Sequence, residues 1–265
     1  SQPPRLGIGD DGRMMVRDVQ PKRVFGMKGL TRQKGWVFGA MLAFLAPGAW
    51  AQSVTVEVGG RAISLVAPEG HCFLDKTIEA DKRLLSITER GFSGINRLLV
   101  QFADCGELNL WRNGRQPTLN NFGYAFVSIK AEHKMVNISR QAFLTRLATY
   151  LAAKEGRDSL EKGLSIGVKR LERMRNAGDH NIRMGERKVL GLMFRDENAL
   201  CVGIVLGLTT EFGKQKTALG CGIVTVLRNR VVNLQIFRPN DARSVELLMS
   251  SARELAAMNV AINER

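Results

Sequence analysis

Residues 222–237 read Gly-Ile-Val-Thr-Val-Leu-Arg-Asn-Arg-Val-Val-Asn-Leu-Gln-Ile-Phe, and this stretch decides the fold class. Two runs rich in β-branched and other apolar side chains flank Arg228-Asn229, a pattern typical of two antiparallel strands joined by a tight turn. Two further apolar runs precede this stretch. We therefore predict a four-stranded antiparallel meander, with strands over 189–194, 200–208, 222–227 and 231–237.

Amphipathic helices are predicted on both sides of this meander. Residues 139–154 carry one apolar stripe behind Ser139, a residue type that favours the N-cap position. Residues 245–256 carry a similar stripe, and Asp241 or Ser244 is the predicted N-cap. Because an apolar helix face must be buried against another element, we expect this last helix to cover the sheet.

Residues 54–129 alternate between extended and helical patterns. The elements predicted there are a hairpin over 54–66 around Gly59-Gly60, a short extended piece over 72–75, a helix from Glu79 to Gly91 or Gly94, a strand over 97–103, a short helix or irregular loop over 108–114, and a strand over 124–129. Strands and helices are thus mixed along the chain without a regular βαβ order.

Composition narrows the class of protein further. The chain has 265 residues with a formal net charge of +14, and 45% of its residues are apolar. A disordered polymer, collagen and a bundled membrane protein would each need a different composition. No repeat of fixed period and no low-complexity linker interrupts residues 52–265. We predict a single α+β domain there, with an antiparallel sheet covered by helices in an α/β/α sandwich.

Residues 27–51 follow the order of a secretory signal peptide. A cationic start precedes the uncharged residues 35–46, and Ala49 and Ala51 supply the small side chains that a signal peptidase requires. Twelve residues are too few to cross a bilayer comfortably, which takes about 20. We therefore predict cleavage between Ala51 and Gln52; a buried core helix or an uncleaved anchor is the alternative.

The segment ahead of this signal, residues 1–26, has no periodic apolar face and is predicted to be a disordered extension. Removing residues 1–51 leaves 31 basic and 22 acidic residues, a net charge of +9. The new first residue, Gln52, is not the cysteine that a lipoprotein anchor needs. We expect a periplasmic or secreted protein with no transmembrane segment after cleavage.

All four cysteines lie after the predicted cleavage point. An even number of cysteines in an oxidising compartment favours disulfides. Close pairs such as C-x-x-C, which are typical of zinc sites, are missing, and we predict no metal or cofactor. Three pairings are open; we favour Cys72 with Cys105 and Cys201 with Cys221, because each pair would join neighbouring elements and so staple the domain.

One family resemblance follows from these elements. The extended stretch ending Ala67-Pro68-Glu69-Gly70, the helix after it and the terminal meander with its helix resemble the Mog1/PsbP-like α/β/α sandwich. That family occurs among exported and thylakoid-lumenal accessory proteins. The resemblance implies an accessory role, but the charged insertion at about 155–185 and the four cysteines depart from the pattern, and no functional residue is carried over.

Catalytic motifs are incomplete. Residues 163–167 match G-x-S-x-G around Ser165, but a charged helical stretch precedes them where a serine hydrolase has a buried strand. Asp179 and His180 are the nearest acid and base. We interpret the match as chance spacing within a helix, and a hydrolase assembled from distant residues is the alternative function.

Other motifs are weaker still. Ser159 and Lys162 match S-x-x-K and Lys216-Thr217 resembles the lysine motif of penicillin-recognising enzymes, but the S-D-N element is missing. His71 and His133 are interpreted as surface or structural histidines.

Residues 154–188 hold ten basic and six acidic residues. Their thin apolar stripe predicts a solvated surface helix, and a basic docking face is the alternative. Together these observations favour an exported, non-catalytic binding or accessory protein of the cell envelope, with an envelope protein or an anionic lipid surface as its partner. Nucleic acid is not expected, because no basic and aromatic stacking motif is present.

Overall fold

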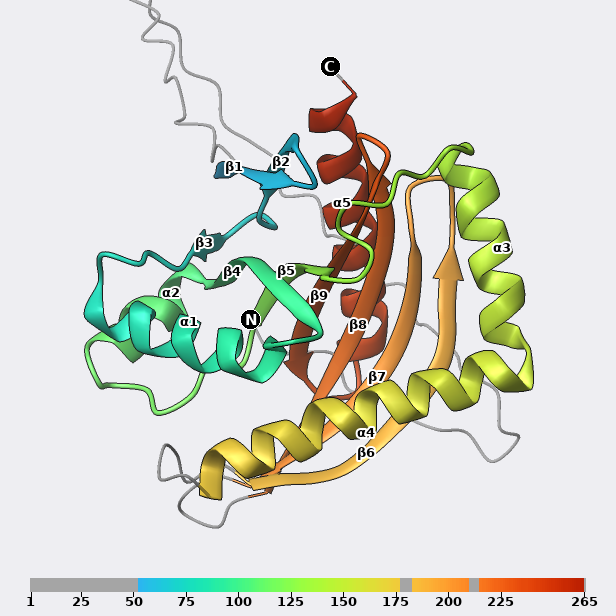
Figure 1. Ribbon diagram of the computed structural model, residues 1–265. Helices are drawn as coiled ribbons and strands as arrows, with labels where there is room; N and C mark the ends of the chain where they lie inside the picture. The colour runs from blue at the N-terminus through green and yellow to red at the C-terminus, as the bar shows by residue number, and fades with distance from the viewer. Residues whose placement is uncertain (1–51, 177–182, 210–214, 265) are drawn as a thin grey trace, which may run out of the picture. The chain divides into compact units, whose positions relative to one another are not determined.

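The central element of the computed structural model is an antiparallel sheet with the strand order β3-β4-β5-β9-β8-β7-β6 (Figure 1). The structure describes residues 52–176, 183–209 and 215–264, and the sheet has seven strands within these ranges. The strands are β3 (His71–Phe73), β4 (Asn96–Asp104), β5 (Phe122–Ser128), β6 (Arg183–Arg195), β7 (Leu200–Thr209), β8 (Gln215–Leu227) and β9 (Arg230–Pro239).

Helices lie on both faces of this sheet (Figure 1). They are α1 (Glu79–Phe92), α2 (Cys105–Arg112), α3 (Arg140–Ala152), α4 (Lys154–Asn176) and α5 (Ser244–Asn263). None of the helices in the described ranges combines the length and the apolar character that crossing a bilayer would require.

The alternation of side chains along the strands decides which helix covers which face. Cys221 and Ile223 on β8 and Leu234 on β9 share a buried core with Leu248 and Leu255 of α5. On the opposite face, a second core forms where α3 meets the sheet. Its members include Leu144 of α3 and Leu200 and Val202 of β7.

Helix α1 packs on the same face as α3. The ring of Phe92 lies 5.1 Å from that of Tyr124 and 5.0 Å from that of Phe126, both on β5. The residues of β5 that alternate with these rings, Ala125 and Val127, belong to the core beneath α5. The predicted α+β fold, with helices covering an antiparallel sheet, is therefore confirmed.

A separate two-stranded hairpin, β1 (Ser53–Val58) and β2 (Arg61–Val66), packs on α5. The predicted turn at Gly59-Gly60 is confirmed, with positive φ angles of 53° and 77°. Such angles are open to glycine at little cost.

The meander is confirmed, with longer strands than predicted. β6 begins at Arg183 instead of residue 189, and β8 begins at Gln215 instead of residue 222. The early part of β8, residues 215–221, is rich in small and polar residues, so it carries a weak strand signal. Pairing with β7 extends it, because the two strands match residue for residue from Leu200↔Val224 to Thr209↔Gln215.

The N-caps of two helices illustrate one confirmed and one wrong prediction. Ser139 caps α3, where its Oγ accepts a hydrogen bond from the Ala142 amide. For α5 the prediction of Asp241 or Ser244 was wrong, because the N-cap is Arg243 and makes no side-chain cap bond. The Ser244 hydroxyl donates to the Pro239 carbonyl, and the Asp241 carboxylate accepts from the Arg243 amide.

Candidate binding surface

Three turns from distant parts of the sequence are held together by one buried arginine. Arg230, at the start of β9, is 7% exposed. Its Nη1 donates to the His133 carbonyl at 3.1 Å, and its Nη2 donates to the Gly59 carbonyl at 2.6 Å. The β1–β2 turn, the loop that follows β5 and the β8–β9 turn therefore form one structural unit.

A second arginine strengthens the same junction. Arg97 on β4 forms a bidentate ion pair with Glu132 through Nε and Nη2. Its Nη2 also donates to the Glu57 carbonyl of β1 at 2.7 Å. The hydrogen bonds from Arg97 hold the pKa of the Glu132 carboxyl below its usual value. Bidentate pairs of this kind fix geometry as well as charge.

The turns approach one another too closely for larger residues. A Cβ atom on Gly59 would lie 2.3 Å from the Glu132 carbonyl oxygen, so only glycine fits there. In the β8–β9 turn Arg228 and Asn229 have φ angles of 45° and 63°. The Asn229 carbonyl accepts a hydrogen bond from the Val136 amide at 3.0 Å, which fastens the turn to the loop.

The exposed residues of this junction are mainly basic and in part apolar. Ile129 and Met135 are exposed by 45% and 48%. Four exposed cationic side chains stand on the same three turns, and within the described part of the chain none of the four forms an ion pair. We name this set the basic loop surface; it consists of Arg61, Ile129, Lys130, Lys134, Met135 and Arg228.

Negative charge at this surface is small. Residues 57–61, 129–136 and 228–230 contain five Lys or Arg and two Glu. Of these two glutamates, Glu132 is already paired with Arg97, whereas Glu57 forms no ion pair within the described ranges. Such a cluster of cations attracts anions by an interaction that salt screens.

Sequence reasoning did not find this surface. It placed a basic docking face, as an alternative, on residues 154–188. The structure shows that α4 accounts for Lys154–Asn176, as the predicted surface helix requires, but the side chains that would decide the docking alternative lie mostly outside the described residues. The sequence does show several Lys and Arg residues in the predicted turns. This pattern is a weak indication of a binding surface, because the sequence does not show that the three turns lie together.

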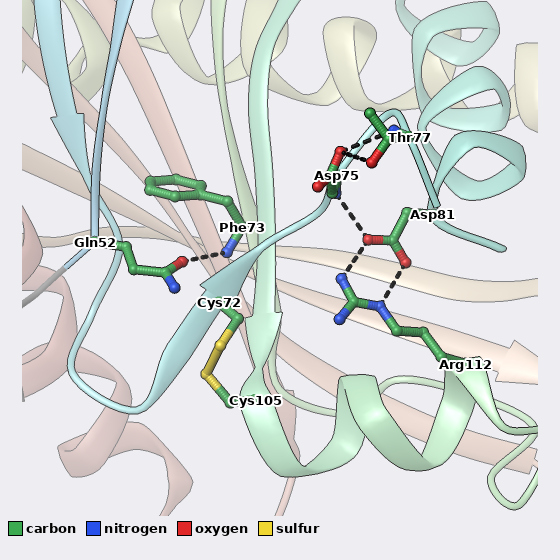
Figure 2. Close-up of polar contacts among 8 residues, drawn as sticks. All are labelled: Gln52, Cys72, Phe73, Asp75, Thr77, Asp81, Cys105 and Arg112. Atoms are coloured by element: carbon green, nitrogen blue, oxygen red, sulfur yellow. Dashed lines mark hydrogen bonds and ion pairs between the residues drawn. A yellow bond between two sulfur atoms is a disulfide. The ribbon is translucent and has the colours of Figure 1, made fainter. Parts of the chain in front are cut away.

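The first predicted cysteine pair is confirmed. Cys72 on β3 and Cys105 at the start of α2 lie at disulfide distance, with Cα atoms 5.0 Å apart (Figure 2). The Cys105 amide also donates to the Gly70 carbonyl at 2.9 Å. The bond therefore ties the edge strand β3 to the helix that follows β4.

The second pair, Cys201 and Cys221, is confirmed as well, with Cα atoms 5.8 Å apart. In the ladder between β7 and β8 they are diagonal neighbours, because Cys201 pairs with Ile223 and Gly203 pairs with Cys221. Both side chains point into the core beneath α5 and are fully buried.

Figure 2 also shows an ion pair between Asp81 and Arg112. Asp81 on α1 is 0% exposed and accepts hydrogen bonds from Arg112 of α2 and from the Asp75 amide. The hydrogen bond to Asp81 raises the pKa of the Arg112 guanidinium. This pair satisfies its own charges and connects α1 to α2, so it is a structural feature.

The candidate catalytic residues are not brought together in the part of the chain that the structure describes. Ser165 lies within α4, so the G-x-S-x-G segment is helical and forms no strand-to-helix turn. Its proposed partners, Asp179 and His180, lie outside the described residues.

The other motif residues are also separate. Ser159 and Lys162 lie on α4, while Lys216 is on β8 and donates to Thr118 and Asn120. The ring of His71 contacts Phe102, and the His133 side chain is exposed. Among the described residues no group of three or more His, Cys, Asp or Glu is placed to hold a metal ion.

The predicted cleavage site is only partly described. Ala49 and Ala51 lie outside the described residues, whereas Gln52 lies inside them. The Gln52 side chain accepts a hydrogen bond from the Phe73 amide at 3.3 Å (Figure 2). Its carbonyl accepts one from Ala67. Gln52 is therefore integrated into the fold, and cleavage itself stays a prediction.

No protein-family model matches the sequence, and no curated protein matches it. The resemblance to the Mog1/PsbP-like sandwich stays a prediction.

Proposed function

We propose that this is an exported, disulfide-stabilised protein of the cell envelope that acts by binding an anionic partner. The observation that carries the proposal is the basic loop surface: four cations with no ion-pair partner among the described residues, and two exposed apolar residues, on three turns joined by Arg230 and Arg97. A rigid scaffold lowers the entropy cost of binding, because the contact residues are already positioned.

Export is supported by the signal-like segment 27–51 and by the two cysteine pairs. Disulfides persist in oxidising compartments and are rare in the cytosol. A non-catalytic role is supported by the helical setting of Ser165, since a nucleophile of that motif requires a sharp turn after a strand.

Intact-mass measurement on the protein recovered from its native host, with and without alkylation, tests the proposal. We expect a chain that begins at Gln52 and takes up no alkylating reagent unless it is first reduced. A chain that retains residues 27–51 and carries four free thiols would refute export. The hydrolase alternative is tested by a broad esterase screen, in which Ser165→Ala is expected to behave like the wild type.

A further inference from the structure

The basic loop surface combines two kinds of side chain that a purely ionic contact does not need. Its cations are flanked by Ile129 and Met135, and each of these apolar side chains is nearly half exposed. Both lie on the loop that Arg230 and Arg97 anchor, Ile129 at its start and Met135 next to the residue bonded to Asn229. Exposed apolar residues that lie among cations can bind a partner surface in which a charged layer covers an apolar layer.

We infer that the basic loop surface docks on a membrane that contains anionic phospholipid, with Arg61, Lys130, Lys134 and Arg228 at the headgroup phosphates and Ile129 and Met135 inserted between the headgroups. The inference rests on the proposed function and names its partner. Basic clusters bind anionic leaflets by attraction that acts within a Debye length, and apolar insertion adds a contribution that salt does not screen.

Lipid is favoured over an acidic protein by the composition of the surface. An acidic protein could pair with the cations. To bury Ile129 and Met135 as well, it would also need an apolar pocket that matches the positions of these two side chains. A bilayer provides apolar depth at every point beneath its phosphates, so the rigid loop needs no shape-matched partner.

Neutralising the four cations tests whether they contact the headgroup phosphates. The variant is Arg61→Gln/Lys130→Gln/Lys134→Gln/Arg228→Asn, where asparagine is chosen because residue 228 has a φ of 45° and asparagine tolerates the left-handed region. The matched control is Arg83→Gln/Arg146→Gln/Lys162→Gln/Lys188→Gln, four exposed cations on α1, α3, α4 and β6. Both variants lose the same net charge, so a difference between them reports position.

The measurement is co-sedimentation of the disulfide-bonded protein, as its host processes it, with phosphatidylglycerol–phosphatidylcholine vesicles and with phosphatidylcholine vesicles alone. We expect binding to the anionic vesicles at low salt. Each charge is worth about fivefold in affinity, so the loop variant, which loses four charges, should bind on the order of 600-fold more weakly, while the control stays near the wild type. Equal losses in the two variants would overturn the inference.

A second variant tests whether Ile129 and Met135 insert between the headgroups. Ile129→Gln/Met135→Gln should remove the binding that persists at high salt, whereas Leu110→Gln/Leu247→Gln, exposed apolar residues on α2 and α5, should not. An unchanged salt profile would show that nothing inserts and would overturn the inference.

A soluble polyglutamate serves as the competing partner. If the protein binds polyglutamate through the same four cations but binds no anionic vesicle, the lipid inference fails while the proposed binding function stands. The proposed function fails separately, if the recovered protein is unprocessed and its thiols are reduced.

Discussion

Asn259 on α5 and Val66 on β2 exchange two hydrogen bonds across 193 residues of sequence. The Asn259 side-chain oxygen accepts from the Val66 amide at 3.1 Å, and its side-chain nitrogen donates to the Val66 carbonyl at 3.1 Å. One helical turn later Asn263 repeats the same exchange with Ser64. The side-chain amides of Asn259 and Asn263 thus provide hydrogen-bond partners for the backbone of β2 on the edge that does not face β1, as a neighbouring strand would do.

Removing the side-chain amide of Asn259 should destabilise the protein. In Asn259→Ala the amide and carbonyl of Val66 remain buried without partners, which we expect to cost about 2 to 4 kcal/mol in the free energy of unfolding. Urea denaturation measures the loss. Asn263→Ala is the companion variant and should cost less, because the Ser64 contact is partly open to water. A loss below about 0.5 kcal/mol for Asn259→Ala would show that this edge carries no stability.

Sequence reasoning succeeded where the interactions are local. The apolar runs within 222–237 and the tight turn between them predicted the meander, and Gly59-Gly60 within the extended stretch 54–66 predicted the first hairpin. It could not find the partners of Arg230, since those carbonyls lie 97 and 171 residues away and carbonyls are present at every residue. The candidate surface depends on such contacts, so it became visible only when the turns were seen together.

The Asp81–Arg112 pair provides a test of a buried charge. In Arg112→Ala the carboxylate of Asp81 would keep, among the residues that the structure describes, the Asp75 amide as its one partner, and the expected cost is about 3 to 5 kcal/mol. Arg115→Ala, an exposed arginine just beyond α2, should change stability by less than about 0.5 kcal/mol. Thermal or urea unfolding of the two variants measures the loss of stability in each. If they behave alike, the ion pair does not stabilise the junction of α1 and α2.

The two cysteine pairs should differ in reactivity because they differ in exposure. Cys72 and Cys105 are partly exposed, whereas Cys201 and Cys221 are 0% exposed beneath α5. A reducing thiolate must reach a sulfur atom, so mild reduction of the folded protein should open Cys72–Cys105 first. Alkylation followed by peptide mass spectrometry reports the order. Equal labelling of all four cysteines at the earliest time would show that the fold opens before reduction.

Loss of either disulfide should also lower stability through the unfolded chain. The pairs close loops of 33 and 20 residues, for which the chain-entropy model gives about 3 to 4 kcal/mol each. Cys72→Ser/Cys105→Ser tests the exposed pair without adding a free thiol. Its urea midpoint should fall well below that of the wild type, and an unchanged midpoint would contradict the model.

Acid should loosen the junction that supports the basic loop surface. Arg97 lowers the folded-state pKa of Glu132 below the ordinary value of 4.5, so the pair stabilises the fold fully above pH 4.5. The unfolded chain takes up the proton first as pH falls, and the stabilisation is lost progressively from about pH 4.5 down through the folded pKa. Because Arg97 is 42% exposed, we expect a contribution of only about 1 kcal/mol at neutral pH.

Urea unfolding at several pH values, for the wild type and Glu132→Gln, checks this expectation. The variant should be less stable than the wild type at pH 7, and the difference should shrink as pH falls below 4.5. Glu264→Gln is the control, because Glu264 pairs with Arg140 while remaining 59% exposed and so should contribute less at either pH. A difference between the wild type and Glu132→Gln that stays constant from pH 7 to pH 3 would mean that the Glu132 charge does not stabilise the junction, which would then depend on Arg230 and its two carbonyl partners.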